Sequence, residues 1–308
     1  MKIVFSEEYT VKNYRHIFRT DKFSAVLRLL LKEGVVSKED IVEPRPPSRA
    51  DLLLAHTPAW VRKNLEFKFT PEDGAKTELR ITSGVARAHL MNVGGTMAAA
   101  RLALETGLGI NCGGGSHHAF ADHGEGFCLL NDIATAVKKL RAEKKIKRAL
   151  IIDLDVHQGN GTASIFKKNK NIFTFSMHQR DIYPELKKKS SLDLELHAGA
   201  GDAAYLRLLR HNLPVVFDKA RPDIVVYNAG VDVYAHDLRG GLKLTMAGVL
   251  KRDKMVFTEC LGRKTPVILV LSGGYAAKFS DTVRLHANTI KAAIGLWRKQ
   301  RAGRGKII

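Results

Sequence analysis

Five short apolar segments recur along the chain, and each one ends in glycine or in a cluster of polar residues. In the sequence they are "LGINCGGG", "RALIIDLDV", "IFTFSMH", "DIVVYNAGVD" and "PVILVLSGGY". Continuous runs of Val, Ile and Leu are typical of strands that are buried on both faces of a parallel sheet. Between these runs, apolar residues recur with helical spacing over residues 92–106, 131–145, 203–212 and 245–261.

The alternation of these strands and helices predicts an α/β fold with a parallel sheet covered by helices on both faces. No internal repeat and no long linker interrupts the pattern, so we expect residues 1–308 to form a single domain. In such sheets the ligand site lies outside the carboxyl ends of the strands. Every polar cluster named above falls at a carboxyl end.

Composition adds little to the fold but limits the class of protein. The chain has 308 residues, of which 45% are hydrophobic and 26% charged, as in an ordinary globular protein. No apolar run reaches the roughly 18 to 20 residues that a membrane span needs, and "MKIVFSEEYT" lacks the apolar stretch of a signal peptide. We therefore expect a cytoplasmic protein. Three scattered cysteines, Cys112, Cys128 and Cys260, are expected to be buried free thiols.

The net charge of +19 would attract a polyanion such as nucleic acid, an acidic protein segment or an anionic lipid surface. Charge alone does not choose among these partners, and the basic residues also fit ordinary solvated surfaces. They cluster, without aromatic residues that could stack on bases, at 138–148, 167–170, 187–189 and 298–306. The last cluster is expected to be a loose basic tail beginning at about residue 298.

The segment "IDLDVHQGNG" suggests a metal site. Asp153, Asp155 and His157 occupy alternate positions at the end of a buried strand, so their side chains are predicted to share one face. Asp232 follows another predicted strand and could supply a third ligand. Three protein ligands with an open fourth position are the arrangement of a hydrolytic zinc site. A helix cap would also explain Asp232 if it stood alone.

Two further polar groups follow predicted strands. His117 and His118 come after "CGGGS", where glycines allow the backbone to approach a ligand closely. Asp153 is suited to hold one of these imidazoles in a fixed tautomer rather than to bind a metal. Tyr275, in "LSGGYA", could donate a hydrogen bond to a developing oxyanion, although a half-buried aromatic residue at the rim of the core is an equally simple interpretation.

Taken together, "GGGSHHAFADHGEGFCLLNDIATAV", "IDLDVHQGNGTASIF", "NAGVDVYAHD" and "LSGGYA" resemble the zinc-dependent histone deacetylase family and its bacterial relatives. The resemblance runs from about residue 4 to residue 294. The combination "DVHQGNG" is most similar to the class IV branch. The resemblance implies the arginase-deacetylase fold, which has three αβα layers around a single, mostly parallel sheet of about eight strands. It also implies hydrolysis of N-acyl-lysine amides in a protein or peptide, by a deacetylase or a de-fatty-acylase.

The resemblance also implies a role for each polar residue. Asp155, His157 and Asp232 are similar to the zinc ligands, although two carboxylates and one imidazole also suit iron(II). His117 and His118 are similar to the family's paired histidines, with His118 as the base that activates water and later as the acid. Tyr275 is similar to the tyrosine that stabilises the oxyanion.

Three further implications follow from the same resemblance. A structural potassium ion would be held by Asp153, Asp155, His157, Ser176 and Met177, and a second one by residues 166, 169 and 172. Phe127 and Gly126 would line the tunnel for the lysine side chain. Asn160 stands where most members have an aspartate beside the second histidine. A neutral amide can orient His118 but does not stabilise its cation, so Asn160→Asp is predicted to raise the pKa of the acidic limb of kcat/KM.

Two other functions stay open at this point. One is an amidohydrolase of a small acetylated metabolite such as an acetylpolyamine, although "FKFTPEDGAKTELRI" carries no long insertion that would restrict access to the site. The other is a polyanion-binding protein with a vestigial metal site. The sequence identifies neither the acyl chain nor the oligomeric state.

Overall fold

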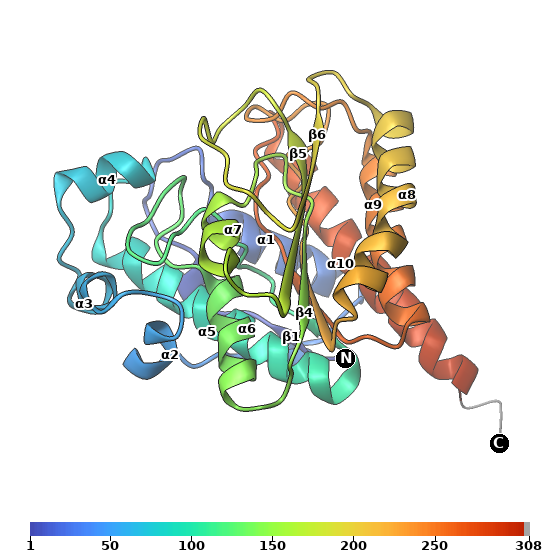
Figure 1. Cartoon of the computed structure of the whole chain (residues 1–308), viewed down its shortest axis with the longest axis horizontal. Coiled ribbons are helices and arrows are strands. Elements are labelled where there is room, and N and C mark those ends of the chain that lie inside the picture. Colours follow the sequence, from blue (N-terminus) through green and yellow to red (C-terminus); the bar gives the residue numbers. More distant parts are fainter. Residues whose placement is uncertain (305–308) are drawn as a thin grey trace.

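Six parallel strands form the central sheet, in the spatial order β3-β8-β7-β4-β5-β6 (Figure 1). The computed structural model describes residues 1–304. Along this order the strands are Leu108–Ile110, Val267–Val270, Ile224–Asn228, Ala149–Asp153, Ile172–Gln179 and Leu192–Leu196. Four of them, β3, β4, β7 and β8, are buried along their whole length, which explains why their sequences read as continuous apolar runs.

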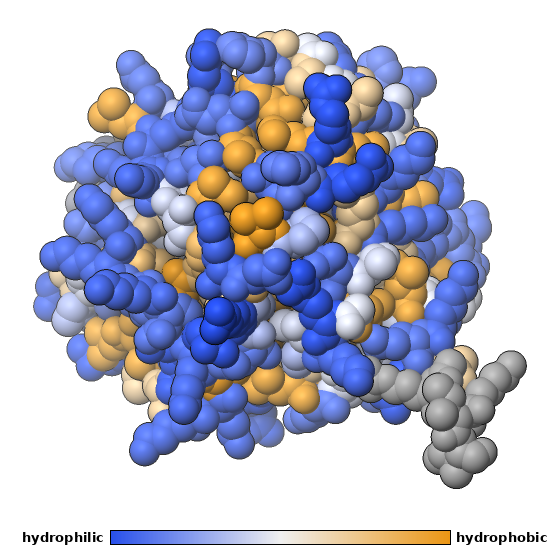
Figure 2. Space-filling view, turned by 45° about the vertical axis from the view of Figure 1, so that its right-hand side comes forward, coloured by the Kyte–Doolittle hydropathy of each residue, from blue (hydrophilic) through white to orange (hydrophobic). Residues whose placement is uncertain are grey.

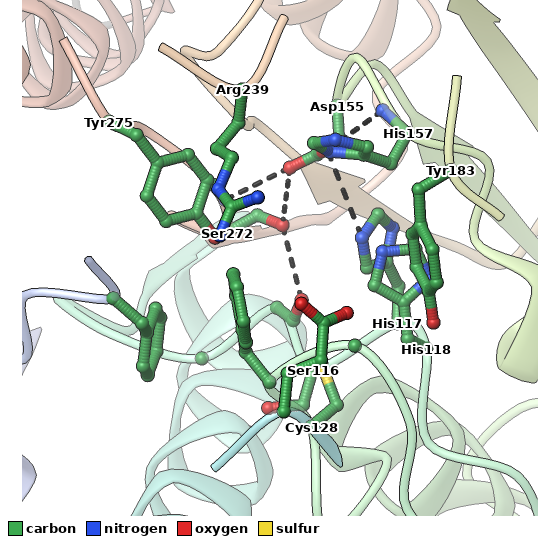
Figure 3. Close-up of a pocket in the computed structure, with 17 residues that line it drawn as sticks. Ser116, His117, His118, Cys128, Asp155, His157, Tyr183, Arg239, Ser272 and Tyr275 are labelled. Carbon is green, nitrogen blue, oxygen red and sulfur yellow. Dashed lines mark hydrogen bonds and ion pairs between the residues drawn. The ribbon is translucent and has the colours of Figure 1, made fainter. Parts of the chain in front are cut away.

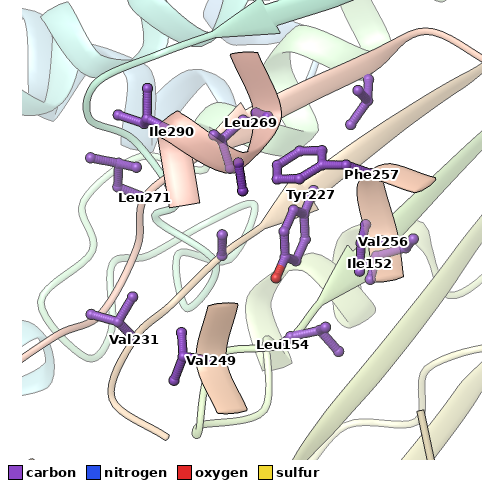
Figure 4. Packing of buried hydrophobic residues seen from close by; sticks show 14 of the residues in the cluster. Ile152, Leu154, Tyr227, Val231, Val249, Val256, Phe257, Leu269, Leu271 and Ile290 are labelled. Atoms are coloured by element: carbon purple, nitrogen blue, oxygen red, sulfur yellow. The ribbon is translucent and has the colours of Figure 1, made fainter. Parts of the chain in front are cut away.

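Successive residues of each central strand pack into opposite layers of the core. In β4, Leu150 and Ile152 belong to one hydrophobic cluster, whereas Ala149 and Ile151 belong to the other. The first cluster lies between the sheet and helices α1, α8, α9 and α10, and Figure 4 shows Tyr227 of β7 against Phe257 of α9 within it. The second cluster lies against α2, α3, α5, α6 and α7. The protein therefore has three αβα layers, as predicted.

The two helical layers are placed on either side of the sheet in Figure 1. The helices are α1 (Asp21–Lys32), α2 (Arg49–Leu53), α3 (Pro58–Glu66), α4 (Pro71–Thr77), α5 (Ser83–Thr106), α6 (Asp132–Ala142), α7 (Asn160–Phe166), α8 (Asp202–Ala220), α9 (Met246–Gly262) and α10 (Phe279–Arg304). Two short 3₁₀ helices, η1 (Glu7–Tyr9) and η2 (Lys38–Asp40), lie near the N-terminus.

The predicted sheet of about eight strands is divided into six strands and two. The remaining strands, β1 (Ile3–Val4) and β2 (Ile41–Val42), pair only with each other along their length. An isolated bridge between Val4 and Asn111 connects this small sheet to the chain directly after β3. With two residues in each strand, the small sheet is too short to continue the main ladder.

All five predicted strands and all four predicted helices are present, with differences at their ends. Helix α8 continues past Pro214 to Ala220, although a proline usually ends a helix. Leu213, Val216 and Phe217 of this segment are buried, and their packing outweighs the lost hydrogen bond. Strand β6 was not predicted, because it lies at the edge of the sheet and is only partly buried.

The basic tail expected from about residue 298 is largely the end of a helix. Helix α10 extends to Arg304, and on its last turns Arg298 donates a hydrogen bond to the carbonyl of Val35, while Gln300 donates one to the carbonyl of Leu261. The part of this expectation that concerns residues 305–308 lies outside the described residues.

The surface is mainly hydrophilic. Figure 2 shows a face covered mainly by hydrophilic residues, with apolar residues in scattered patches between them. A polyanionic partner for this surface stays a prediction. The three cysteines are buried and unpaired, as expected. Among the helices within residues 1–304, none combines the length and the apolar character that crossing a membrane requires.

Candidate active site

The carboxyl ends of the central strands surround one cavity of about 250 Å³. Figure 3 shows the side chains that line it. Most come from loops after β3, β4, β5, β7 and β8, whereas Phe18 precedes α1 and Glu78 follows α4. The predicted residues His117, His118, Asp155, His157 and Tyr275 all belong to this lining. The cavity lies where α/β sheets bind their ligands, because the loops that leave neighbouring parallel strands converge at one edge.

Asp155, His157 and Asp232 converge on one point at the bottom of this cavity. Strand β4 ends at Asp153, so Asp155 and His157 lie on the following bend, and Asp232 lies on the loop after β7. His157 Nδ1 is 3.1 Å from Asp155 Oδ1 and 3.3 Å from Asp232 Oδ2. One ligand atom from each residue lies within 4.8 Å of the others. The sequence interpretation of these three residues as one cluster therefore agrees with their positions.

The hydrogen bonds around the two carboxylates leave room for a cation. Asp155 Oδ2 accepts a hydrogen bond of 2.9 Å from the N–H of Gly273, and Asp232 Oδ1 accepts one of 2.8 Å from the N–H of Val156. Asp232 Oδ2 is buried and has no hydrogen-bond partner. A Cβ on Gly273 would lie 2.1 Å from this atom, so only glycine leaves the space open. A buried oxygen without a partner, beside a second carboxylate and an imidazole, fits a divalent metal ion.

The two paired histidines have different partners. His117 Nδ1 is 2.7 Å from Asp153 Oδ2, and Asn228 Nδ2 donates a hydrogen bond of 2.9 Å to Asp153 Oδ1. His118 Nδ1 is 2.7 Å from Asn160 Oδ1. Asp153 thus contacts the first histidine and not the predicted metal position, which matches the supporting role expected from the sequence.

These partners move the pKa values of the two imidazoles in opposite directions. Burial alone would lower the pKa of His117, but the carboxylates of Asp153 and Asp155 outweigh it and raise the pKa to about 9. Burial lowers the pKa of His118 well below 6.5, and the positive charges of His117 and His157 lower it further. Of these two imidazoles, His117 is therefore charged at neutral pH, whereas His118 is neutral and able to accept a proton.

Tyr275 is positioned through its backbone and its ring. Its N–H donates a hydrogen bond of 2.6 Å to Asp237 Oδ2. The ammonium of Lys22 lies 5.3 Å from the centre of its ring and donates a hydrogen bond of 2.6 Å to the carbonyl of Ser272. Burial raises the pKa of Tyr275 well above 10, and the nearby carboxylates of Asp232 and Asp155 raise it further. The phenol therefore keeps its proton and can donate a hydrogen bond.

Aromatic side chains form the walls of the cavity. Phe127 stacks on Phe18 with ring centres 6.0 Å apart, and Tyr183 lies edge-on to His118 with centres 5.0 Å apart. Gly126 has a φ of +48°, and a Cβ there would approach the Tyr183 hydroxyl to 2.7 Å. Phe127 and Gly126 thus line the cavity as the resemblance implies, whereas Tyr183 was not foreseen.

The first predicted potassium position adjoins the cavity, whereas the second lies at the amino end of β5. Strand β5 pairs with β4 so that Ser176 is opposite Asp153, and Met177 follows it in the core. Residues 166, 169 and 172 lie on one tight turn, with hydrogen bonds of 2.8 Å from Asn169 N–H to the carbonyl of Phe166 and 3.2 Å from Ile172 N–H to the carbonyl of Asn169. Potassium binding at either place stays a prediction.

Several residues in or beside the cavity were not singled out from the sequence. Glu125 accepts hydrogen bonds from Asn160 Nδ2 at 2.6 Å and from the Tyr183 hydroxyl at 2.7 Å. Glu78 and Arg239 line the cavity and are exposed, so they form its mouth. The signal for Glu125 was the polar residue inside "HGEGFC", a segment that otherwise reads as a glycine-rich loop.

A family model described as a histone deacetylase domain matches residues 16–290, a span that contains every residue discussed at the site. The chain belongs to the histone deacetylase family. Membership places it among the hydrolases of acyl amides, and enzymes of this family typically depend on a metal ion. The match agrees with the resemblance seen in the motifs, and the Asp155–His157–Asp232 cluster gives the chain a site for such an ion.

Histone deacetylase relatives match over nearly the whole chain. An uncharacterized protein of Picosynechococcus is 41% identical over 292 residues, which cover 94% of this chain and 97% of the relative. Histone deacetylase 2 of Arabidopsis thaliana is 31% identical over 312 residues, covering 94% of this chain and 78% of the relative. The crystal structure of the HDA15 HD domain has a TM-score of 0.76 at 24% identity, covering 96% of this chain and 87% of that chain, and it supports the fold.

Proposed function

We propose that this histone deacetylase family member hydrolyses N-acyl-lysine amides in a protein or peptide, with a zinc or iron(II) ion held by Asp155, His157 and Asp232. The observation that carries the proposal is that Asp155 and His157, clustered with the fully buried Asp232, line the same cavity as the His117–His118 pair and Tyr275. A divalent cation bound there supplies Lewis-acid polarisation of the acyl carbonyl and lowers the pKa of water to about 7. Acetyl and longer acyl groups are both candidates for the acyl group that is released as a carboxylic acid.

The chain's own side chains perform the proton transfers. His118 uses Nδ1 to contact Asn160, so Nε2 is the nitrogen that takes a proton from the attacking water. Tyr275 donates a hydrogen bond to the oxygen that becomes negative when the water oxygen bonds to the acyl carbon. The carbon–nitrogen bond then breaks, and His118 returns the proton to the lysine nitrogen. The products are a carboxylic acid and a free amine, while the charged His117 stays paired with Asp153.

The shape and charge of the cavity favour a lysine side chain over a polyamine. Its walls are the rings of Phe127 and Tyr183, which suit an extended aliphatic chain. At its mouth, the carboxylate of Glu78 is offset by the guanidinium of Arg239. The mouth therefore lacks the excess of negative charge that would attract a polycation. This supports the peptide substrate over the acetylpolyamine considered from the sequence.

Metal removal tests the proposal directly. Lysine peptides with acyl chains from acetyl to myristoyl are incubated with the purified protein before and after treatment with a chelator. Hydrolysis of at least one peptide is expected, together with its loss on chelation and its return when Zn²⁺ or Fe²⁺ is added, because the carbonyl and the water both need the cation. Turnover that persists in the chelated protein would contradict the metal mechanism.

The pH profile tests the role assigned to Asn160. In the native protein the low pKa of His118 keeps the base deprotonated as the pH falls below 6.5. In Asn160→Asp a carboxylate would stabilise the imidazolium, so the pKa should rise and kcat/KM should decline at a higher pH. Asn160 Nδ2 now donates a hydrogen bond of 2.6 Å to Glu125, and in the variant a carboxyl oxygen would take the place of Nδ2. Either the new aspartic acid or Glu125 should therefore retain a proton. Superimposable profiles of kcat/KM against pH would exclude this effect.

A further inference from the structure

Glu125 binds the far side of the Asn160 amide that contacts His118, and no role has yet been assigned to it. It belongs to a tight turn closed by hydrogen bonds between Glu125 and Cys128 of 3.0 Å and 2.9 Å. Its Oε1 accepts hydrogen bonds from Asn160 Nδ2 and from the Tyr183 hydroxyl, and its Oε2 lies 3.6 Å from His123 Nε2. Burial would raise the pKa of Glu125, but these three donors outweigh it and lower the pKa, so the group is a carboxylate at neutral pH.

The carboxylate decides which end of the Asn160 amide faces His118. A carboxylate only accepts hydrogen bonds, so the amide must turn Nδ2 toward Glu125. The amide oxygen then faces His118, where it lies 2.7 Å from Nδ1, and it also accepts a hydrogen bond of 3.0 Å from the N–H of Gly161. In the opposite orientation the oxygen would face the carboxylate and the NH₂ group would face an N–H donor.

The orientation of the amide in turn decides the tautomer of His118. An oxygen at 2.7 Å can only accept, so His118 Nδ1 must carry the hydrogen. Nε2 is then free of hydrogen and available as a base. If the amide were reversed, its NH₂ group would require an unprotonated Nδ1, and the hydrogen would move to Nε2. An imidazole in that tautomer is unable to take a proton from water with Nε2.

Tyr183 connects the same carboxylate to the second side of the histidine. Its hydroxyl donates to Glu125 Oε1 at 2.7 Å, and its ring meets the His118 ring edge-on at an interplanar angle of 80°. One carboxylate oxygen therefore fixes both the amide that binds His118 and the aromatic ring that packs against it.

We propose that Glu125 is a positioning residue that fixes the tautomer of His118 through the Asn160 amide and its ring position through Tyr183. The inference rests on the proposed function, since it assigns His118 the base role. In this chain the hydrogen-bond acceptor beside His118 is the neutral amide of Asn160. The negative charge belongs to Glu125, which binds the other end of that amide.

The test combines kinetics with a direct observation of the tautomer. The variants are Glu125→Ala, Glu125→Gln, Asn160→Ala and the double variant Glu125→Ala/Asn160→Ala, with Asp181→Asn as a control because Asp181 is an exposed acid that contacts none of these side chains. Kinetics use the acyl-lysine peptide that the native protein hydrolyses best. The protonation of His118 Nδ1 is read from nitrogen NMR of protein with ¹⁵N-labelled histidine, and the His118 signals are assigned by their absence in His118→Ala.

Glu125→Ala should lower kcat by about 10- to 100-fold, the effect of losing a hydrogen bond to a charged group, with a smaller change in KM. Glu125→Gln should lower kcat less, because the amide oxygen can still accept the hydrogen bonds from Asn160 and Tyr183. Some loss should remain, because the amide can also rotate and turn its NH₂ group toward them. The double variant should be no worse than Asn160→Ala, because Glu125 acts through that amide. In NMR, Nδ1 should be protonated in the native protein, and a mixture of tautomers should appear in Glu125→Ala. Asp181→Asn should behave as the native protein does.

Losses that multiply in the double variant, or an unchanged tautomer in both Glu125 variants, would overturn the inference. Circular dichroism verifies that each variant is folded, and Glu125→Gln, which keeps the size of the side chain, decides the question if Glu125→Ala does not fold. If the native protein hydrolyses none of the acyl-lysine peptides, the proposed function fails. The NMR result still decides the tautomer, since it requires no turnover.

Discussion

Replacing His118 with alanine should lower kcat by about 10²- to 10⁴-fold, the range that general acid–base catalysis contributes. His118 is a buried imidazole whose low pKa leaves it neutral. Its Nδ1 binds Asn160, which leaves Nε2 available for the proton of water. Its removal takes away both the acceptor for the proton of water and the donor to the lysine nitrogen. KM should change little, because the rings of Phe127 and Tyr183 that form the walls of the cavity stay in place.

The measurement is the steady-state hydrolysis of the best acyl-lysine peptide, with metal content determined for each variant. His197→Ala is a matched control, since His197 has a side chain that is 71% exposed and lies outside the cavity lining. The control should retain native kcat. A His118→Ala variant that holds its metal and keeps more than about a tenth of native kcat would refute the assignment of the base.

The second large effect is expected from Asp232→Asn. An amide keeps the size of the side chain and its oxygen can still accept the hydrogen bond from the Val156 N–H, but it removes one of the two negative charges offered to the cation. Metal affinity should fall by more than the roughly 10- to 100-fold that follows loss of an outer-shell partner. Equilibrium dialysis with Zn²⁺ measures this loss without any assay of activity.

The same substitution should stabilise the metal-free protein. Burial and the neighbouring charge of Asp155 raise the pKa of Asp232 from 3.8 to about 7. The folded protein therefore binds this proton more tightly than the unfolded chain, so the native stability falls as the pH rises from about 4 to about 7. Metal-free Asp232→Asn lacks this fall and should have the higher urea midpoint above about pH 7.

The exposed Asp181, with a side chain that is 63% accessible, supplies the control for charge removal. Asp181→Asn should bind metal as the native protein does and show no gain in stability. Native metal affinity in Asp232→Asn would instead remove Asp232 from the ligand set. Lower stability of metal-free Asp232→Asn would show that this carboxylate serves the fold rather than the metal.

The residues found from the sequence are those that directly follow buried strands. Asp155, His157 and Asp232 could be grouped because the carboxyl ends of parallel strands meet at one edge, and this rule needs no knowledge of the loops. The layers were also predictable, since the apolar runs of β4, β7 and β8 are buried on both faces. The division of the strands into a six-stranded and a two-stranded sheet was not predictable, because strands of two residues leave no periodic pattern in the sequence.

The missed residues reach the cavity from places that no local pattern connects to it. Lys22 comes from α1, and its ammonium binds the carbonyl of Ser272, 250 positions further along the chain. Tyr183 and Glu125 lie in irregular loops, and Glu125 binds both Tyr183 and Asn160 only because the chain folds those loops over the start of α7. Asn160 was recognised as a neutral partner of His118, whereas the anion that binds its other end was not.

The order of strands in the sheet also sets a sequence of events during synthesis. Strand β3 carries the His117–His118 loop, but its partner in the sheet is β8, which is synthesised only after α6 to α9. Until then the histidine loop lacks its neighbour, and the N–H of Gly273 that binds Asp155 does not yet exist. The site can therefore be completed only after β8 has been synthesised. Until then β3 presents an unpaired apolar edge, the kind of surface that makes a folding intermediate prone to aggregation.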